Sequence, residues 1–479
     1  MNARALLVAV LLTAGCTLGP DYQRPDVPVP EGWREVSKSE QETLANTPWW
    51  ELFQDPELVS LIDSALAGNQ DLMIAVERIE EARAIYGFTR ADLYPKVDAA
   101  ASASRLRLSE NGVPSIPSGV DSQDTLFSVA GTVFWELDFF GRVRRASEAD
   151  LAQLYAAEEA RRAVVITLVA DVARAYVELR ELDRSLEISQ RTLASRVEYV
   201  DLARVRFEGG KTSELDLRQA EAELHRTESF VHDFEGQVKQ KENEISALLG
   251  RNPGAIPRGR TLDELTVPPA VPAGLPSALL ERRPDVREAE EQLVSANARI
   301  GAAKALLYPS VSLTGAFGFE STELNDVFDS ASRSWSIGAN LLQPIFNSGQ
   351  NRRRVEVTES QERQALYAYE RSVLLAFREV DDSLVGLRQS TLRRGSEGER
   401  VAAERKVLEL AEVRYRGGVS DYLEVLDAQR SLFDAELSST SAQRDEFVAL
   451  IQLYKALGGG WPQAPEPGAT QETDAPHEP

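Results

Sequence analysis

The sequence predicts a mainly α-helical chain with a transmembrane β part, arranged as an internal two-fold repeat. Residues 142–249 are predicted to form a long helical hairpin. Residues 350–457 repeat it 208 positions later, as Gly141 and Gly349 illustrate. Four segments of about 10 residues alternate between apolar and polar side chains, which is the period of a β-strand. A repeat of this length indicates a duplicated structural unit.

The N-terminus has the pattern of a secretory signal at residues 1–15. Arg4 precedes an apolar run, small residues follow, and Cys16 stands at a lipoprotein-type cleavage site. Leu12 lies four positions before Cys16, whereas three is usual, so ordinary signal cleavage with an incidental cysteine is the alternative. We expect Cys16 to carry N-acyl (palmitate) and S-diacylglycerol lipid. Thr17 after it does not resemble an inner-membrane retention signal.

The two repeats contain a helix, two strands and the long hairpin in the same order. In the first repeat, 69–250, these are helix 71–93, strands 97–107 and 126–136, and hairpin 142–249. In the second repeat, 285–458, these are helix 285–307, strands 310–320 and 333–342, and hairpin 350–457. Around the repeats we predict an N-terminal segment with a short helix, a Pro-rich linker and a disordered tail, at 16–68, 251–284 and 459–479.

Apolar residues recur every seven positions in the first hairpin arm, from Val165 to Val200, and a second line begins at Leu168. This a/d pattern indicates helices packed side by side, and a dimeric coiled coil is the alternative. An arm of roughly 60 residues would be about 90 Å long. A Gly-Gly pair at each turn suits a helix C-terminus, and Thr212 or Ser213 can cap the next helix.

Each predicted strand places large apolar residues on one face and mainly Ser, Thr or Asn on the other. A strand of about 10 residues can cross a membrane when tilted; a surface sheet packed on a soluble core is the alternative. Four strands do not close a barrel, and an open sheet edge in lipid leaves backbone groups unsatisfied. We therefore expect several chains to share one barrel, and we favour three because 12 strands leave room for a lumen.

The composition argues against several classes of function. The formal net charge of -23 disfavours nucleic-acid binding, and a single cysteine allows no disulfide within the chain. No stretch of 18 consecutive apolar residues is present. The sequence contains no phosphate-binding loop, no dinucleotide fingerprint and no nucleophile elbow.

The remaining polar candidates do not form a catalytic set. His225 and His232 could share a metal, but we interpret them as exposed helix positions, with no metal and no cofactor beyond the covalent lipid. The acidic pairs at 290–291 and 381–382 are interpreted as exposed charges. We predict a protein that is not an enzyme and that moves solutes passively, with energy supplied by a partner.

Several motifs occur together and in order along the chain. They are Cys16-Thr17-Leu18-Gly19-Pro20-Asp21-Tyr22-Gln23-Arg24-Pro25, Pro48-Trp49-Trp50, Gly274-Leu275-Pro276-Ser277, Arg282-Arg283-Pro284-Asp285-Val286, Tyr415-Arg416-Gly417-Gly418 and Leu423-Glu424-Val425-Leu426-Asp427-Ala428-Gln429-Arg430. With these motifs the chain resembles the TolC/OprM-like outer membrane factors of tripartite efflux pumps, in particular the lipoprotein branch called the NodT family. The resemblance covers the mature chain except its tail.

The resemblance implies a homotrimer in the outer membrane, in contact with its lipid. Three chains would form a 12-stranded β-barrel and a 12-helix periplasmic α-barrel. It also implies two protein partners, a periplasmic adaptor and an inner-membrane pump of the resistance-nodulation-division type, which dock at or towards the helical tip.

Leu423, Asp427 and Arg430 share one helix face just after the second hairpin turn, because their spacings are four and three. In the family, matching positions narrow the periplasmic end at rest. We expect Asp427 and Arg430 to pair across chains and Leu423 to form an apolar constriction; an Asp427–Arg430 pair on one helix is the alternative. The two tips, Gly209-Gly210-Lys211 and Gly417-Gly418-Val419, are the expected adaptor contacts.

Two other functions fit parts of the sequence. A periplasmic coiled-coil lipoprotein could serve as a structural spacer, but it has no use for four alternating strands. A duct of the same type could secrete proteins or polysaccharides, and the sequence does not separate this from export of small molecules.

Overall fold

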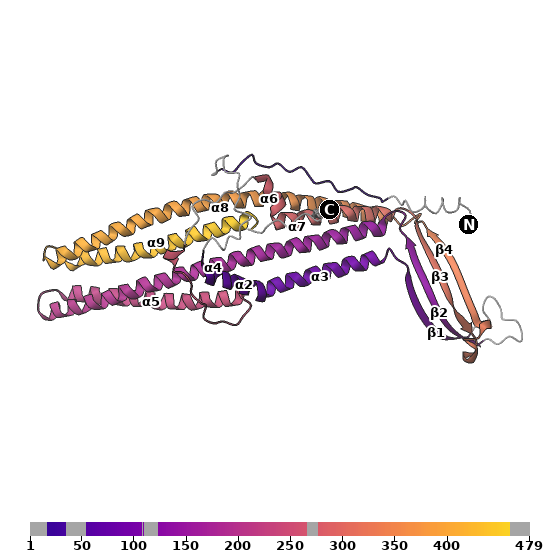
Figure 1. Cartoon of the computed structure of the whole chain (residues 1–479), viewed down its shortest axis with the longest axis horizontal. Coiled ribbons are helices and arrows are strands. Elements are labelled where there is room, and N and C mark those ends of the chain that lie inside the picture. The colour runs from indigo at the N-terminus through magenta and orange to yellow at the C-terminus, as the bar shows by residue number, and fades with distance from the viewer. Residues whose placement is uncertain (1–16, 35–53, 108, 110–122, 266–275, 460–479) are drawn as a thin grey trace, which may run out of the picture. The chain divides into compact units, whose positions relative to one another are not determined.

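The computed structural model describes residues 17–34, 54–107, 109, 123–265 and 276–459 (Figure 1). Cys16, the Pro48-Trp49-Trp50 motif and the tail from residue 460 lie outside these ranges. The helices are α2 Pro56–Gly68, α3 Gln70–Ala91, α4 Arg142–Glu208, α5 Glu214–Leu248, α6 Pro276–Arg282, α7 Pro284–Ala305, α8 Gln350–Arg416 and α9 Tyr422–Ala456. The strands are β1 Lys96–Arg107, β2 Gln123–Leu137, β3 Ser310–Ser321 and β4 Arg333–Leu342.

The predicted elements lie near their predicted positions. The helices predicted at 71–93 and 285–307 end two residues earlier, at Ala91 and Ala305. Strand β2 begins at Gln123 rather than at residue 126. The hairpin arms are unequal, because α4 and α8 have 67 residues each whereas α5 and α9 have 35 each. The long arms are therefore about 100 Å in length. Among the described residues, no helix combines the length and the apolar character that a membrane span requires.

The chain divides into two compact units that cut across the sequence repeat. The first unit contains the described residues within 1–26, 77–158 and 288–370, and the second contains those within 27–76, 159–287 and 371–479. Each unit therefore takes part of both repeats.

The first unit carries an antiparallel four-stranded sheet in the order β1-β2-β3-β4 (Figure 1). The register of the strands places positions from the same face, apolar or polar, next to each other across the sheet. One row on the apolar face is Val97, Val133, Gly315 and Ile337, and one row on the polar face is Asp98, Thr132, Ala316 and Ser336. The alternation predicted from the sequence therefore continues across all four strands.

The apolar face of this sheet is uncovered in the single chain. Ile337 is 83% exposed and Trp335 is 73% exposed, and Val97 and Leu341 are also exposed. A sheet packed on a soluble core would bury these side chains. The observed exposure favours the membrane interpretation, because lipid would cover such a face.

The N-terminal segment is docked inside the first unit. Gly19, with φ +98°, packs so closely on Gly301 that an added Cβ would lie 2.5 Å from the Gly301 Cα. Buried Arg145 donates to the Leu18 carbonyl at 3.1 Å and to Asp21 at 2.6 Å. Glu290 accepts from Tyr22 at 3.1 Å and from Arg24 at 2.8 Å. The interpretation of Glu290 as an exposed charge was therefore wrong, because a segment 266 residues away covers it.

The second unit is built around the middle of α4. The heptad residues Val172, Ala175 and Leu179 are fully buried, with α2 and the ends of α5 and α9 packed on them. This agrees with the predicted a/d seam and shows that the seam packs within one chain.

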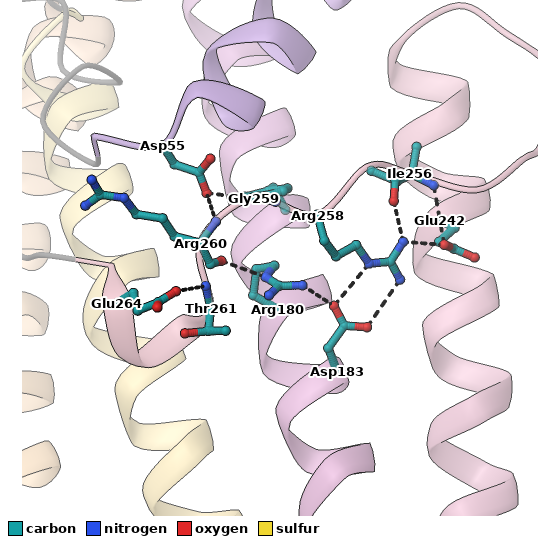
Figure 2. A network of polar contacts seen from close by, with 11 residues as sticks. Asp55, Arg180, Asp183, Glu242, Ile256, Arg258, Gly259, Arg260, Thr261 and Glu264 are labelled. Atoms are coloured by element: carbon teal, nitrogen blue, oxygen red, sulfur yellow. Dashed lines mark hydrogen bonds and ion pairs between the residues drawn. The ribbon is translucent and has the colours of Figure 1, made fainter.

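A polar network fixes the loop after α5 to α4 and α2 (Figure 2). Fully buried Asp55 accepts from the Tyr176 hydroxyl at 2.8 Å and from the Arg260 backbone at 3.0 Å. Arg258 forms a two-pronged contact with Asp183, at 3.1 and 3.2 Å. A Cβ at Gly259 would lie 2.1 Å from Asp55, so the loop passes there only as glycine.

Candidate functional site at the hairpin tips

The two hairpin tips have the same backbone geometry. Gly210 and Gly418 adopt φ of +65° and +71°. After each glycine, a backbone N–H donates back to the carbonyl of the last helical turn, from Lys211 to Arg206 at 2.8 Å and from Val419 to Arg414 at 2.9 Å. The sequence predicted that each Gly-Gly pair ends a helix, and both pairs do so with a left-handed backbone.

The helices that leave the two tips are capped differently. Ser213 caps α5, and Asp216 completes a reciprocal capping box. Thr212 donates its hydroxyl to the same Asp216 carboxylate. Asp421 precedes α9 without a side-chain cap bond. The first tip therefore has the more strongly fixed turn.

Next to the tips, the two hairpins of one chain pack on each other through an apolar cluster. Its buried members come from both hairpins: Val200, Ala203, Leu217, Ala220, Ala411, Tyr422, Val425, Leu426 and Ala428. The first and second hairpins are thus held together at their ends within the chain.

Polar contacts also cross between the hairpins at this level. Buried Arg196 of α4 donates to Gln429 of α9, and Arg430 of α9 pairs with buried Glu223 of α5. Tyr199 of α4 donates to Glu412 of α8 at 2.6 Å. We call these six residues the crossing contacts: Arg196, Tyr199, Glu223, Glu412, Gln429 and Arg430.

The crossing contacts are incompletely satisfied. In the part of the chain that the structure describes, the Nε atoms of Arg196 and Arg430 and the hydroxyl of nearby Tyr422 are buried without a hydrogen-bond partner. Burial lowers the pKa of Arg196, because its charge is removed from water. The hydrogen bond to Glu223 raises the pKa of Arg430. A buried cation with an unused donor contributes less to stability than a fully paired one.

The predicted tip residues occupy different environments. Leu423 is 53% exposed and Asp427 is also exposed, whereas Arg430 is half-buried. The described ion pairs link Arg430 to Glu223 and none links it to Asp427. The alternative pair on one helix is therefore not formed in this chain. Asp427 lies close enough to raise the pKa of Arg430 as a smaller contribution.

Sequence reasoning missed Arg196, although the sequence held a signal for it. Arg196 falls on the d line of the heptad that begins at Leu168, where an apolar residue is expected. A charged residue at a seam position indicates a buried polar contact. The signal for Glu223 was absent, because its importance depends on the packing of a helix 207 residues away.

The two histidines are exposed, as predicted. His225 lies 3.1 Å from Glu228 and His232 lies 3.8 Å from Glu235 on the same helix. Within the described ranges, no group of three or more His, Cys, Asp or Glu residues could hold a metal ion.

Long paired helices and an uncovered four-stranded sheet together define the class of outer-membrane channels with a helical extension. Comparison with known proteins agrees. The family model described as "Outer membrane efflux protein" matches residues 61–251 and 275–459. The chain belongs to this family of transport proteins.

The similarity extends over nearly the whole chain. The solvent efflux pump outer membrane protein SrpC of Pseudomonas putida is 39% identical over 95% of this chain and 97% of its own length. Outer membrane protein OprJ of Pseudomonas aeruginosa is 38% identical, over 95% of each chain. The solved open state of the Neisseria gonorrhoeae MtrE channel superposes with a TM-score of 0.84 at 33% identity, over 94% of this chain and 100% of MtrE.

The protein is an outer-membrane channel of a tripartite efflux system. It lies in the outer membrane and extends long helices into the periplasm. Channels of this class are trimers. The structural-spacer alternative is set aside by this assignment.

Proposed function

We propose that three copies of this chain form a passive exit duct for small molecules that rests closed at the hairpin tips. The observation that carries the proposal is the set of crossing contacts, which ties the second hairpin to the first at the level of Leu423 and Asp427. Asp427 would face Arg430 of a neighbouring chain, and Leu423 would narrow the opening.

The chemistry of the crossing contacts suits a closed state that opens readily. In the closed tip, buried Arg196 and half-buried Arg430 each keep a buried Nε donor unused in the described chain, so part of their desolvation is not compensated. When the hairpins separate, water can hydrate both guanidinium groups. The polar contacts then favour closure only modestly, and the binding energy of a partner can reverse the balance.

Single-channel conductance in planar bilayers tests the proposal. Arg430→Ala with Asp427→Ala, and separately Glu223→Gln, should raise the conductance several-fold, because each removes contacts that hold the tip closed. Arg218→Ala is the matched control, since the described partners of Arg218, Glu214 and Glu221, both lie on α5. Unchanged conductance in both test variants would contradict the proposal.

We also propose that a periplasmic adaptor binds the tips Gly209-Gly210-Lys211 and Gly417-Gly418-Val419, and that a resistance-nodulation-division pump supplies the energy. The tips support this because both turns are exposed and Val419 is 70% exposed. Lys211→Glu should weaken cross-linking to the adaptor of the same system. Equal cross-linking of both proteins would argue against Lys211 as a contact.

We further propose that Cys16 carries lipid. Its neighbours support this, because Thr17 lies against Gly141 and the Leu18 N–H donates to the Phe140 carbonyl at 3.3 Å, directly after β2. An acyl chain on Cys16 would therefore start near the end of the sheet where β2 leads into α4. Radiolabelled palmitate should enter the wild-type protein but not Cys16→Ala; label in both would place the lipid elsewhere.

A further inference from the structure

The strands and helices of the first unit meet at one end of the sheet. At this edge, which runs across the strands, β1 and β3 begin and β2 and β4 end. The register pairs Lys96 with Phe134 and Ser310 with Leu342 at this edge. Three amphipathic aromatic residues lie there: Tyr94, Trp135 and Tyr308. Trp135 donates its indole N–H to the Leu93 carbonyl at 3.0 Å. Tyr and Trp are enriched where a membrane meets water, so this edge marks the interface.

In the junction from β2 to α4, nearby carboxylates pair with the arginines. Arg142 forms a two-pronged contact with Glu136, at 2.9 and 2.8 Å. Arg144 contacts Asp138 at 3.3 Å and also donates its backbone N–H to that carboxylate at 2.9 Å. The basic groups of this junction therefore have partners inside the chain.

The corresponding junction from β4 to α8 differs. At the 208-residue shift, Pro344 and Phe346 stand where Glu136 and Asp138 stand in the first copy, so the acids are missing. Ile345 and Phe346 are 96% and 88% exposed. They precede three arginines in the first turns of α8, Arg352, Arg353 and Arg354.

Two of these arginines have no partner in the described chain. Arg353 pairs with Glu356 at 2.6 Å. Arg352 and Arg354 are exposed, and no described residue forms a hydrogen bond or ion pair with either side chain. We call Ile345, Phe346, Arg352 and Arg354 the basic junction.

We propose that the basic junction binds an anionic phospholipid of the periplasmic leaflet. The chemistry on each side fits such a molecule. An arginine guanidinium pairs with a phosphate through two parallel hydrogen bonds. The exposed isoleucine and phenylalanine would contact the upper part of the acyl chains. The position selects the leaflet, because the basic junction continues from the membrane sheet on the side where the helices begin.

Lipid binding to the purified full-length chain tests the proposal. The chain in uncharged detergent is titrated with fluorescent phosphatidylglycerol and, separately, with phosphatidylcholine carrying the same label. Wild type should bind phosphatidylglycerol more tightly, and added salt should reduce the difference. Arg352→Gln with Arg354→Gln should raise the Kd for phosphatidylglycerol about five-fold per arginine, because each basic group near anionic lipid contributes about 1 kcal/mol. The Kd for phosphatidylcholine should rise much less, because its own choline cation balances the charge of its phosphate.

Two further variants make the test specific. Arg78→Gln with Arg371→Gln removes the same charge from exposed positions elsewhere on α3 and α8, and it should leave both Kd values unchanged. Ile345→Ser with Phe346→Ser should raise the Kd for both lipids by the same factor, because this double substitution removes only apolar contacts. An unchanged Kd for phosphatidylglycerol in the double arginine variant would overturn the proposal. Loss of the trimer on size-exclusion chromatography would also overturn it, since the arginines would then be contacts between chains.

Discussion

Glu181 on α4 is a carboxylic acid placed where its charge is unfavourable. Burial raises its pKa, although the nearby Arg444 and hydrogen bonds from Ser185 and Ser441 lower it in part. The folded state therefore holds its proton more tightly than the unfolded chain. Between the ordinary glutamate pKa and the raised value, the folded state binds more protons, so its stability falls as pH rises through this window.

Glu181→Gln should therefore raise the thermal unfolding temperature at neutral pH. The substitution keeps an oxygen for the two serine hydroxyls and removes the buried charge. The gain should vanish when the pH falls below the ordinary glutamate value, because wild-type Glu181 is then protonated in both states. Thermal circular dichroism at several pH values measures this. Glu198→Gln, at an exposed position on the same helix, is the control and should show no pH-dependent gain. A gain that persists at low pH would contradict the assignment to the Glu181 charge.

At the scale of secondary structure, the two tips offer a natural comparison of helix caps. Ser213 bonds to the Asp216 backbone and receives a reciprocal contact, whereas Asp421 makes no side-chain cap bond. Ser213→Ala should cost about 1 kcal/mol of local stability at the start of α5. Asp421→Ala should cost less at the start of α9, where only the interaction of its charge with the helix end is lost. Hydrogen exchange of the first-turn amides measures both, and equal changes at the two tips would contradict the capping argument.

The elements of this chain were predictable because they rest on local patterns. The heptads of α4 and the alternation of the four strands each express one period over many residues, and no proline interrupts the hairpin arms. The turns were predictable from their glycines, since a left-handed backbone lets N–H groups after the turn bond to the last carbonyls of each long helix. What the patterns did not predict were contacts between distant segments. The partner of Arg430 lies 207 residues away, and the segment that covers Glu290 lies 266 residues away. Such pairs depend on how the finished helices pack.

At the scale of the whole molecule, the position of the candidate site could be predicted from the sequence. The side-chain contacts within the site could not. The spacing of Leu423, Asp427 and Arg430 places them at a tip, and the structure adds that the tip is held by contacts between the two hairpins of one chain. In the gate that we propose, opening would therefore separate the two repeats of each chain as well as neighbouring chains. A duplicated sequence supplies two similar hairpins, and a few unlike residues such as Arg196 and Glu223 hold them together.

The ring itself can be tested through the two outer strands of the sheet. Strands β1 and β4 are separated by β2 and β3, so their backbones lie about 14 Å apart within one chain. A disulfide requires Cβ atoms about 4 Å apart, so a bond between them cannot form inside the chain. In a closed barrel, β1 of one chain lies next to β4 of another. We expect Ala101→Cys, combined in turn with cysteines at successive β4 positions from Ser336 to Ala339, to cross-link at matching registers into a ladder that stops at three chains. Each single variant is the control and should form no ladder. A ladder that continued past three chains would replace the trimer with a larger ring, and no cross-link at any register would mean that these strands do not meet.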